Sequence, residues 1–308
     1  MEKRERPSYE VWDEKFARRS VPPYCIYEVE TEKGIARITF NKPERLNAAT
    51  PGDVREIREK TIEAEEDPKV KVVIYKGAGQ CFSSGVDLEW LSHAFNIKGE
   101  RRLSQRYKYL RSGPFLDRRG LYQTVLYCLK ATIAQVHGYC YGSGFQIACA
   151  CDIVVASEDA IFTNPAYKYI GASPEDMVLL FLTMGIKKTK EMMLTGQVLD
   201  AQEALKCGLI NKVVPRDKLE EEVNKIAETV ARQPYDAIVM GKANFEAALD
   251  IAGVGACETA GHAQETWQSN IQYRPGEFNL IKSLAEKGVK GAIQEREDFY
   301  SGAPLRRK

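Results

Sequence analysis

Residues 132–157 read TIAQVHGYCYGSGFQIACACDIVVAS, and this stretch carries the main indication of the fold. Its first part, TIAQVHG, is β-branched and apolar and predicts a strand, and IVVAS at its end predicts another. Between them, GSGFQIACACD predicts a helix of small residues that packs closely against its neighbours. A strand, a helix and a further strand in this order are typical of an α/β protein with parallel strands.

The same alternation continues on both sides of this stretch. CIYEVE and IARITF predict two strands, VKVVIYKG predicts a buried strand and LINKVVP a later one. Helices are expected over PGDVREIREKTIEAEED, with Val54, Ile57 and Ile62 on one apolar face, and over SPEDMVLLFLTMG, with Ser173 as N-cap. AQEALKCG predicts a short helix, and the pattern is helical from Lys218 onward.

This order of elements predicts three parts. Residues 1–24, which contain the pair Pro22-Pro23 near their end, form an N-terminal arm, because paired prolines disfavour both helix and sheet. Residues 25–215 form an α/β core, and residues 216–308 form a helical C-terminal region.

The composition is that of a globular protein whose charges nearly balance. The 308 residues are 44% hydrophobic and 28% charged, and 44 Lys and Arg against 43 Asp and Glu leave a net charge of +1. This balance provides no broad field for a polyanion, so we expect neither nucleic acid nor a membrane as a partner. No apolar run reaches the ~18 to 20 residues of a membrane-spanning helix, and the first residues lack the apolar stretch of a secretory signal. A cytoplasmic location is therefore expected.

The cysteines and histidines do not indicate a metal site. The eight cysteines are scattered without a CxxC pair, and only three histidines are present. We expect most of these cysteines to be buried thiols. For His137, at the end of a predicted strand, we expect a structural role.

Two turns that follow predicted strands are the candidates for a ligand site. The first is CFSSGVDL (residues 81–88), whose small residues let the backbone approach a ligand closely. The second is HGYCYGSGFQ (residues 137–146), which leads into a helix whose first N–H groups suit an anionic oxygen. Neither is a P-loop or a GxGxxG motif, which disfavours nucleotide triphosphate chemistry. Each alone is an ordinary turn, but one N–H from each, converging on a carbonyl oxygen, would stabilise an enolate.

The chain resembles the crotonase, or enoyl-CoA hydratase/isomerase, superfamily from Ile26 to Phe299. Five segments carry the resemblance in the family's order: IARITFNKPERLNA, DPKVKVVIYKGAGQCFSSGVDL, KATIAQVHGYCYGSGFQIACACDIVVASEDAIFTNP, MGIKKTKEMMLTGQVLDAQEALKCGLINKVVP and KGVKGAIQERE. The resemblance implies a spiral of ββα units and a C-terminal helical region that builds a homotrimer or a dimer of trimers. It also implies an acyl-CoA thioester as substrate, with coenzyme A as part of that substrate and no separate metal or redox cofactor.

By the family's pattern, the backbone N–H groups of Val86 and Ser143 would hold the thioester oxygen. Arg45 and Asn47 lie on the loop where the family holds the nucleotide end of CoA, and a cation there would pair with phosphate. Lys42 lies on the same loop, with a solvated surface position as its alternative, and Lys282 is a second candidate for the phosphate. Further candidates for the substrate pocket are Ser84, Gly85, Asp87, Leu88, Tyr141, Gln146, Asn164 and Tyr167.

The chain departs from the family at the two glutamates that hold a water in a typical hydratase. Gln146 and Ala166 stand at these positions, and neither side chain takes a proton at neutral pH. Glu175 and Asp176 are the candidate catalytic replacements, although Ser-Pro-Glu-Asp is also a good helix start, where acids favour the dipole. Glu89 is a further acid near the first turn, with a solvent-facing position as its alternative.

These features predict an enzyme that stabilises a thioester enolate. Hydration by a displaced acid, double-bond isomerisation and hydrolytic carbon–carbon cleavage beside a ketone all use that enolate, and all three stay open. The unusual acids and the tyrosines favour a bulky or cyclic acyl group. A function of another class is a catalytically silent acyl-CoA-binding or assembly subunit, since both expected glutamates are missing.

Overall fold

The computed structural model describes residues 22–94, 120–165, 177–257, 259–261 and 273–301. Two of the sequence predictions fall largely outside these ranges. They are the N-terminal arm over residues 1–24 and the start of the helix predicted at Ser173.

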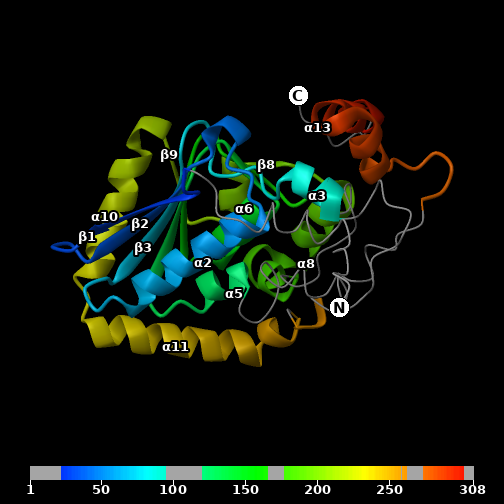
Figure 1. Ribbon diagram of the computed structural model, residues 1–308. Helices are drawn as coiled ribbons and strands as arrows, with labels where there is room; N and C mark the ends of the chain where they lie inside the picture. The colour runs from blue at the N-terminus through cyan, green and yellow to red at the C-terminus, as the bar shows by residue number, and fades with distance from the viewer. Residues whose placement is uncertain (1–21, 95–119, 166–176, 258, 262–272, 302–308) are drawn as a thin grey trace, which may run out of the picture.

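A six-stranded sheet forms the centre of the protein, with the strand order β1-β2-β3-β4-β6-β9 (Figure 1). β1 and β2 pair antiparallel and each following pair is parallel. The strands are β1 (Cys25–Glu30), β2 (Ile35–Phe40), β3 (Val72–Gly77), β4 (Ala131–Val136), β6 (Ile153–Ser157) and β9 (Lys212–Val214). All six strands predicted from the β-branched segments are present, so the α/β core with parallel strands is confirmed.

A second sheet of three short strands has the order β5-β7-β8. Its strands are β5 (Tyr139–Tyr141), β7 (Ile161–Thr163) and β8 (Leu199–Asp200). A unit of two strands and a helix occurs twice, as β4-β5-α6 (Ser143–Ala150) and as β6-β7-α8 (Met177–Thr195). In each unit the first strand belongs to the large sheet and the second to the small sheet. This recurrence is the predicted spiral of ββα units, and it brings the start of α6 directly after β5.

Helices cover both faces of the large sheet, because successive residues of a strand point to opposite sides. Val73 of β3 belongs to the main hydrophobic cluster, which includes the buried face of α2 (Pro51–Glu66). Its neighbour Val72 belongs to a second cluster that includes α10 (Leu219–Ala231). Figure 1 shows α2 and α10 on opposite sides of the sheet. The remaining short helices are η1 (Pro43–Arg45), α3 (Leu88–Ala94), α5 (Leu121–Leu126), α9 (Ala201–Lys206) and η2 (Arg216–Lys218).

The buried face of helix α2 differs from the prediction at one residue. Val54 and Ile57 are fully buried as expected, but Ile62 is 40% exposed. The buried face continues instead through Thr61 and Ala64, because a period of 3.6 residues brings positions 54, 57, 61 and 64 to one side.

The described elements after β9 are helical, as the sequence predicts. The partly buried Val214 of β9 packs against the hydrophobic cluster that contains Leu219 of α10, so the first helix of the predicted C-terminal region lies against the sheet. Two long helices follow, α11 (Tyr235–Ile251) and α13 (Leu280–Phe299). Figure 1 shows α13 beside α3, at the far end of the molecule from α10. No helix in the described ranges is both long and apolar enough to cross a membrane.

Candidate active site

The two predicted turns lie side by side, joined by backbone hydrogen bonds. Ser83, in the turn after β3, forms a parallel β-bridge with Cys140 of β5. The Ser83 N–H donates to Tyr139 O at 2.9 Å, and the Tyr141 N–H donates to Ser83 O at 3.0 Å. Because β5 runs directly into α6, this pairing fixes the first turn against the start of that helix.

A third segment, residues 46–49, holds the first turn from its other side. Ala49 forms a parallel β-bridge with Val86. The Ala49 N–H donates to Gly85 O at 2.9 Å, and the Asp87 N–H donates to Ala49 O at 3.0 Å. The backbone around Val86 is therefore held as firmly as a short strand, although it lies in a loop.

Two glycines allow the turns to touch. Gly85 has φ +97°, and a Cβ there would lie 2.8 Å from Tyr141 O and 3.3 Å from Ser143 N. A Cβ at Gly144 would lie 2.7 Å from the Cβ of Ser83. The contacts of 2.8 Å at residue 85 and 2.7 Å at residue 144 are too short for a side chain, so the close approach of the two backbones requires glycine at both positions.

The two proposed oxyanion donors lie at this contact. Val86 follows Gly85 directly, and Ser143 is the first residue of α6. No hydrogen bond from the N–H of Val86 or of Ser143 is found within the described part of the chain. A first-turn N–H has no partner in its own helix and carries the helix's positive end, so it favours an anionic oxygen.

Two buried side-chain atoms near these donors also have no hydrogen-bond partner in the described ranges: Ser143 Oγ and Asn164 Nδ2. Asn164 directly follows Thr163, whose carbonyl oxygen accepts from the Gly142 N–H at 3.1 Å. Both polar groups therefore belong to the segments that meet at the start of α6, where a buried polar atom without a partner costs about 1–3 kcal/mol.

The other predicted pocket residues occupy different places. Gln146 is buried on α6, and the half-buried Tyr141 of β5 contacts the exposed Tyr139 edge to face at 5.2 Å between ring centres. Leu88, at the start of α3, packs against both the main cluster and that of α13. Ser84 donates its N–H to Leu46 O at 2.9 Å. Tyr167, Glu175 and Asp176, with Ala166, lie outside the described residues.

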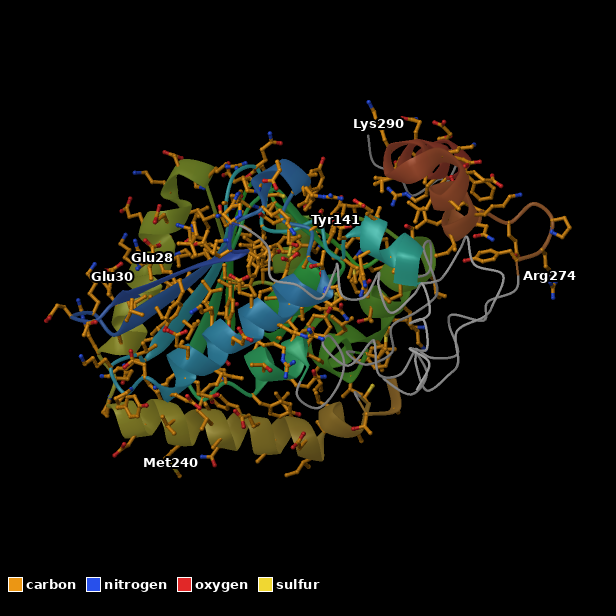
Figure 2. The ribbon with its side chains drawn as sticks, viewed as in Figure 1. Glu28, Glu30, Tyr141, Met240, Arg274 and Lys290 are labelled. Atoms are coloured by element: carbon orange, nitrogen blue, oxygen red, sulfur yellow. The ribbon has the colours of Figure 1, made fainter. Side chains whose placement is uncertain are left out.

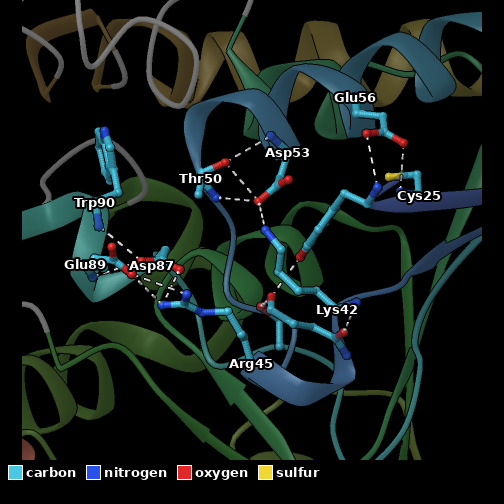
Figure 3. A network of polar contacts seen from close by, with 12 residues as sticks. Cys25, Lys42, Arg45, Thr50, Asp53, Glu56, Asp87, Glu89 and Trp90 are labelled. Atoms are coloured by element: carbon cyan, nitrogen blue, oxygen red, sulfur yellow. Dashed lines mark hydrogen bonds and ion pairs between the residues drawn. The ribbon is translucent and has the colours of Figure 1, made fainter. Parts of the chain in front are cut away.

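Arg45 forms two ion pairs that link the predicted CoA loop to residues at and just after the end of the first turn (Figure 3). Its Nη2 lies 3.2 Å from Asp87 Oδ2 and 3.3 Å from Glu89 Oε2. Lys42, in contrast, pairs with the buried Asp53 at 2.7 Å. Asp53 also forms the capping box of α2 with Thr50, so Lys42 is part of the fold around that helix start. Lys282 is exposed on α13, 3.9 Å from Glu286.

Asn47, predicted to bind substrate, lies wholly inside the fold. Its Nδ2 is within hydrogen-bond distance of three backbone oxygens, those of Ala78 (3.0 Å), Cys81 (2.9 Å) and Phe82 (3.2 Å). Its Oδ1 accepts from the Lys42 N–H at 2.9 Å. The side chain thus holds the loop after β2 against the first turn, and its polar atoms are used within the fold.

Sequence reasoning missed Ser83. Its Oγ donates to Asn47 O at 2.8 Å and accepts from the Gly85 N–H at 3.1 Å. This hydroxyl links the loop after β2 to the glycine that touches α6. The only signal was a serine two residues before a turn glycine, a pattern typical of side-chain to backbone bonds in turns.

Known proteins share this architecture and sequence pattern. The family model described as enoyl-CoA hydratase/isomerase matches residues 30–278. The mitochondrial enoyl-CoA hydratase domain-containing protein 3 of Rattus norvegicus is 31% identical over 274 residues, which are 88% of this chain and 82% of that protein.

Two solved structures show the same fold. An enoyl-CoA hydratase/isomerase from Xanthobacter autotrophicus Py2 has a TM-score of 0.76 at 30% identity, over 89% of this chain and 97% of that one. An enoyl-CoA hydratase from Mycobacterium smegmatis has a TM-score of 0.78 at 25% identity, over 92% and 96% of the two chains. The spiral of ββα units, the two touching turns and these similarities agree, and the chain belongs to the enoyl-CoA hydratase/isomerase, or crotonase, superfamily.

Proposed function

We propose that this protein processes an acyl-CoA by stabilising the enolate of its thioester between the N–H groups of Val86 and Ser143. One observation carries the proposal: both N–H groups lie where the two turns touch, and neither has a partner in the described ranges. Family membership supports a CoA thioester as the substrate. One such donor typically contributes about 2.7–4 kcal/mol to lowering the barrier.

The reaction that follows the enolate depends on a proton-transfer group. Gln146 stands on α6 at the position where the resemblance to typical hydratases implies a glutamate, and an amide does not act as an acid or base at neutral pH. We keep Glu175 and Asp176 as the proposed acid–base groups. The proposed chemistry is hydration, double-bond isomerisation or hydrolytic carbon–carbon cleavage of a bulky or cyclic acyl-CoA.

Gln146 also favours the alternative, an acyl-CoA-binding subunit without activity. Exchange of the substrate's α-protons in D₂O distinguishes the two, because it reports enolate formation whatever product follows. We expect saturated acyl-CoA to gain mass in D₂O in the presence of the protein. Binding without any mass gain, together with no turnover of enoyl-CoA, would support the silent subunit.

A proline at position 143 tests the Ser143 donor directly. Proline lacks an N–H and is tolerated at the first position of a helix, which Ser143 occupies in α6. Ser143→Pro should slow α-proton exchange by roughly 10²–10³-fold relative to Ser143→Ala, which keeps the N–H. Free CoA, which has no thioester oxygen, should bind both variants equally. Equal exchange rates would remove Ser143 N–H from the mechanism.

The proposed carboxylates are tested by their neutral isosteres. Glu175→Gln or Asp176→Asn should lower turnover by roughly 10²–10⁴-fold, the usual range for general acid–base catalysis, with CoA binding retained. A role in capping the helix would instead lower the melting temperature and leave turnover per folded molecule unchanged. If neither variant loses activity, both residues leave the mechanism.

We further propose that Arg45 contacts a phosphate of CoA. Arg45→Ala should weaken CoA binding, because a charge-assisted contact is lost. The weakening should be smaller with 3′-dephospho-CoA if the ribose phosphate is the partner. Equal weakening for both ligands would assign Arg45 to another part of CoA.

We also propose assembly as a homotrimer or a dimer of trimers. Three large apolar residues of α11 support it, since Met240, Phe245 and Ile251 are exposed. Figure 2 shows Met240 projecting away from the body of the protein. Light scattering that gives a stable monomer at micromolar concentration would contradict the assembly.

A further inference from the structure

The guanidinium of Arg45 contacts two carboxylates that differ in burial (Figure 3). Its Nη2 is 3.2 Å from Asp87 Oδ2 and 3.3 Å from Glu89 Oε2, and Nη1 is also 3.3 Å from Glu89 Oε2. The Asp87 side chain is 4% exposed, whereas those of Glu89 and Arg45 are 39% and 44% exposed. Another anion can therefore displace Glu89 from Arg45 more easily than it can displace Asp87.

Asp87 is fixed in place by the fold. Its Oδ1 accepts from the N–H groups of Glu89 at 2.8 Å and Trp90 at 3.1 Å, which caps the first turn of α3. Its own N–H donates to Ala49 O at 3.0 Å. Moving this carboxylate would uncap α3 and disturb the residue next to Val86, so Asp87 keeps its contact with Arg45.

The contact between Glu89 and Arg45 is the exchangeable one. Both contacts of Arg45 nitrogens with Glu89 Oε2 are long, and both side chains reach solvent. Exposed ion pairs of this kind contribute little to stability. A phosphate monoester carries more charge than a carboxylate and offers three oxygens, which suit the two-pronged geometry of a guanidinium.

We propose that Glu89 acts as an internal competitor that occupies the guanidinium of Arg45 until a ligand phosphate displaces it. This inference rests on the proposed function, since it takes CoA as the ligand that carries the phosphate. It adds a specificity role for Glu89: a thioester without a phosphate that reaches Arg45 does not displace the carboxylate. Asp87 stays paired throughout and keeps Arg45 attached to the turn that contains Val86.

The test is the affinity for CoA, measured by titration calorimetry on the full chain. Glu89→Gln removes the competing charge and should tighten CoA binding by about two- to fivefold, the range expected for one exposed ion pair. Glu44→Gln is the matched control. Glu44 lies next to Arg45 on η1, is exposed and makes no ion pair within the described residues. Glu44→Gln therefore removes the same charge from the same region and leaves the contact between Glu89 and Arg45 intact.

Arg45→Gln provides the second arm. With Arg45 replaced, Glu89→Gln should no longer change the affinity, because the two substitutions act on one contact. Repeating the titrations with 3′-dephospho-CoA shows which phosphate displaces Glu89. If the 3′-phosphate does so, Glu89→Gln should not tighten the binding of 3′-dephospho-CoA. If the pyrophosphate does so, Glu89→Gln should tighten the binding of both ligands. Melting temperatures confirm that all variants fold.

Three results would overturn the inference while leaving the proposed function intact. They are equal affinities of Glu89→Gln and Glu44→Gln, weaker binding by Glu89→Gln, or the same tightening with Arg45 replaced. Failure of CoA and of acyl-CoA to bind the unmodified protein would overturn the inference and the proposed function together.

Discussion

Gly85 and Ser143 lie so close together that a Cβ added to residue 85 would stand 3.3 Å from the Ser143 nitrogen. The same atom would lie 2.8 Å from Tyr141 O. The two glycine turns are therefore in backbone contact, and the absence of a side chain at residue 85 leaves room beside the Ser143 nitrogen.

Gly85→Ala should damage the site more than the fold. The φ of +97° and the contact with Tyr141 O force the first turn to shift, at a cost of about 1–3 kcal/mol in unfolding free energy. Because we expect the shift to move Val86 relative to Ser143 and so affect both donors, α-proton exchange should fall by more than the roughly 10²–10³-fold that the loss of one donor causes. Exchange rates and urea unfolding of one preparation check both parts. A Gly85→Ala protein that exchanges α-protons at the normal rate would show that the contact between the two turns is not needed for activity.

Asn47→Ala should destabilise the protein without acting on the ligand directly. Three backbone oxygens and the Lys42 N–H lose a buried partner, so the unfolding free energy should fall by about 2–4 kcal/mol. Urea unfolding measures the loss. The affinity of the folded fraction for CoA should stay close to that of the unmodified protein. A large drop in affinity at unchanged stability would return Asn47 to the ligand contacts.

His137 should make the stability of the protein depend on pH. Burial lowers the pKa of this imidazole below the ordinary value of 6.5, and its ring Nε2 lies 3.1 Å from Gly79 O. The unfolded chain therefore takes up a proton near pH 6.5, whereas the folded chain takes it up only at lower pH. Stability should fall as the pH drops from about 7, with a slope of at most about 1.4 kcal/mol per pH unit from this residue.

The control for that prediction is His137→Gln, in which the titrating group is absent. The difference in unfolding free energy between the two proteins should change with pH between about 7 and 5 and stay constant above 7.5. A difference that does not vary with pH would show that His137 is protonated equally in both states.

The thiols should divide into two groups by reactivity. Cys207 and Cys257 are half-buried, and the other six of the eight cysteines are buried without disulfides, as the sequence predicts. Burial raises the pKa of the Cys128 thiol to about 12, which suppresses the reactive thiolate. A thiol reagent at neutral pH should label Cys207 and Cys257 first and the remaining six only after unfolding. Rapid labelling of Cys140 would contradict the buried position of β5.

The sequence predicts most of the framework because the framework depends on local patterns. The β-branched segments mark the strands of the large sheet, and the glycines of residues 137–146 mark the turn into α6. The short strand β8, with two residues, is too brief for any periodicity to show. The prediction places Ile62 on the buried face of α2 because isoleucine is apolar, but the helical period brings the polar Thr61 to that face instead.

The polar side chains of the site are harder to predict, because their roles depend on partners distant in the sequence. Lys42 and Arg45 are three residues apart on the same loop, and the sequence offers both as cations for a phosphate, with Arg45 preferred. Lys42 turns to Asp53 at the start of α2, whereas Arg45 turns to Asp87 after β3. Neither direction follows from residue type, and Asn47 has the same difficulty, since its backbone partners belong to residues 78–82.

Because the proposed oxyanion site is made of main-chain groups, the side chains at positions 86 and 143 are not needed for its chemistry. Val86 is only half-buried and is attached to Ala49 through its backbone neighbours. Protein engineers can therefore vary the side chain of residue 86 while the amide of the proposed oxyanion site stays in place. Residues 85 and 144 offer no such freedom, so a library built for new acyl groups should randomise 86 and keep both glycines.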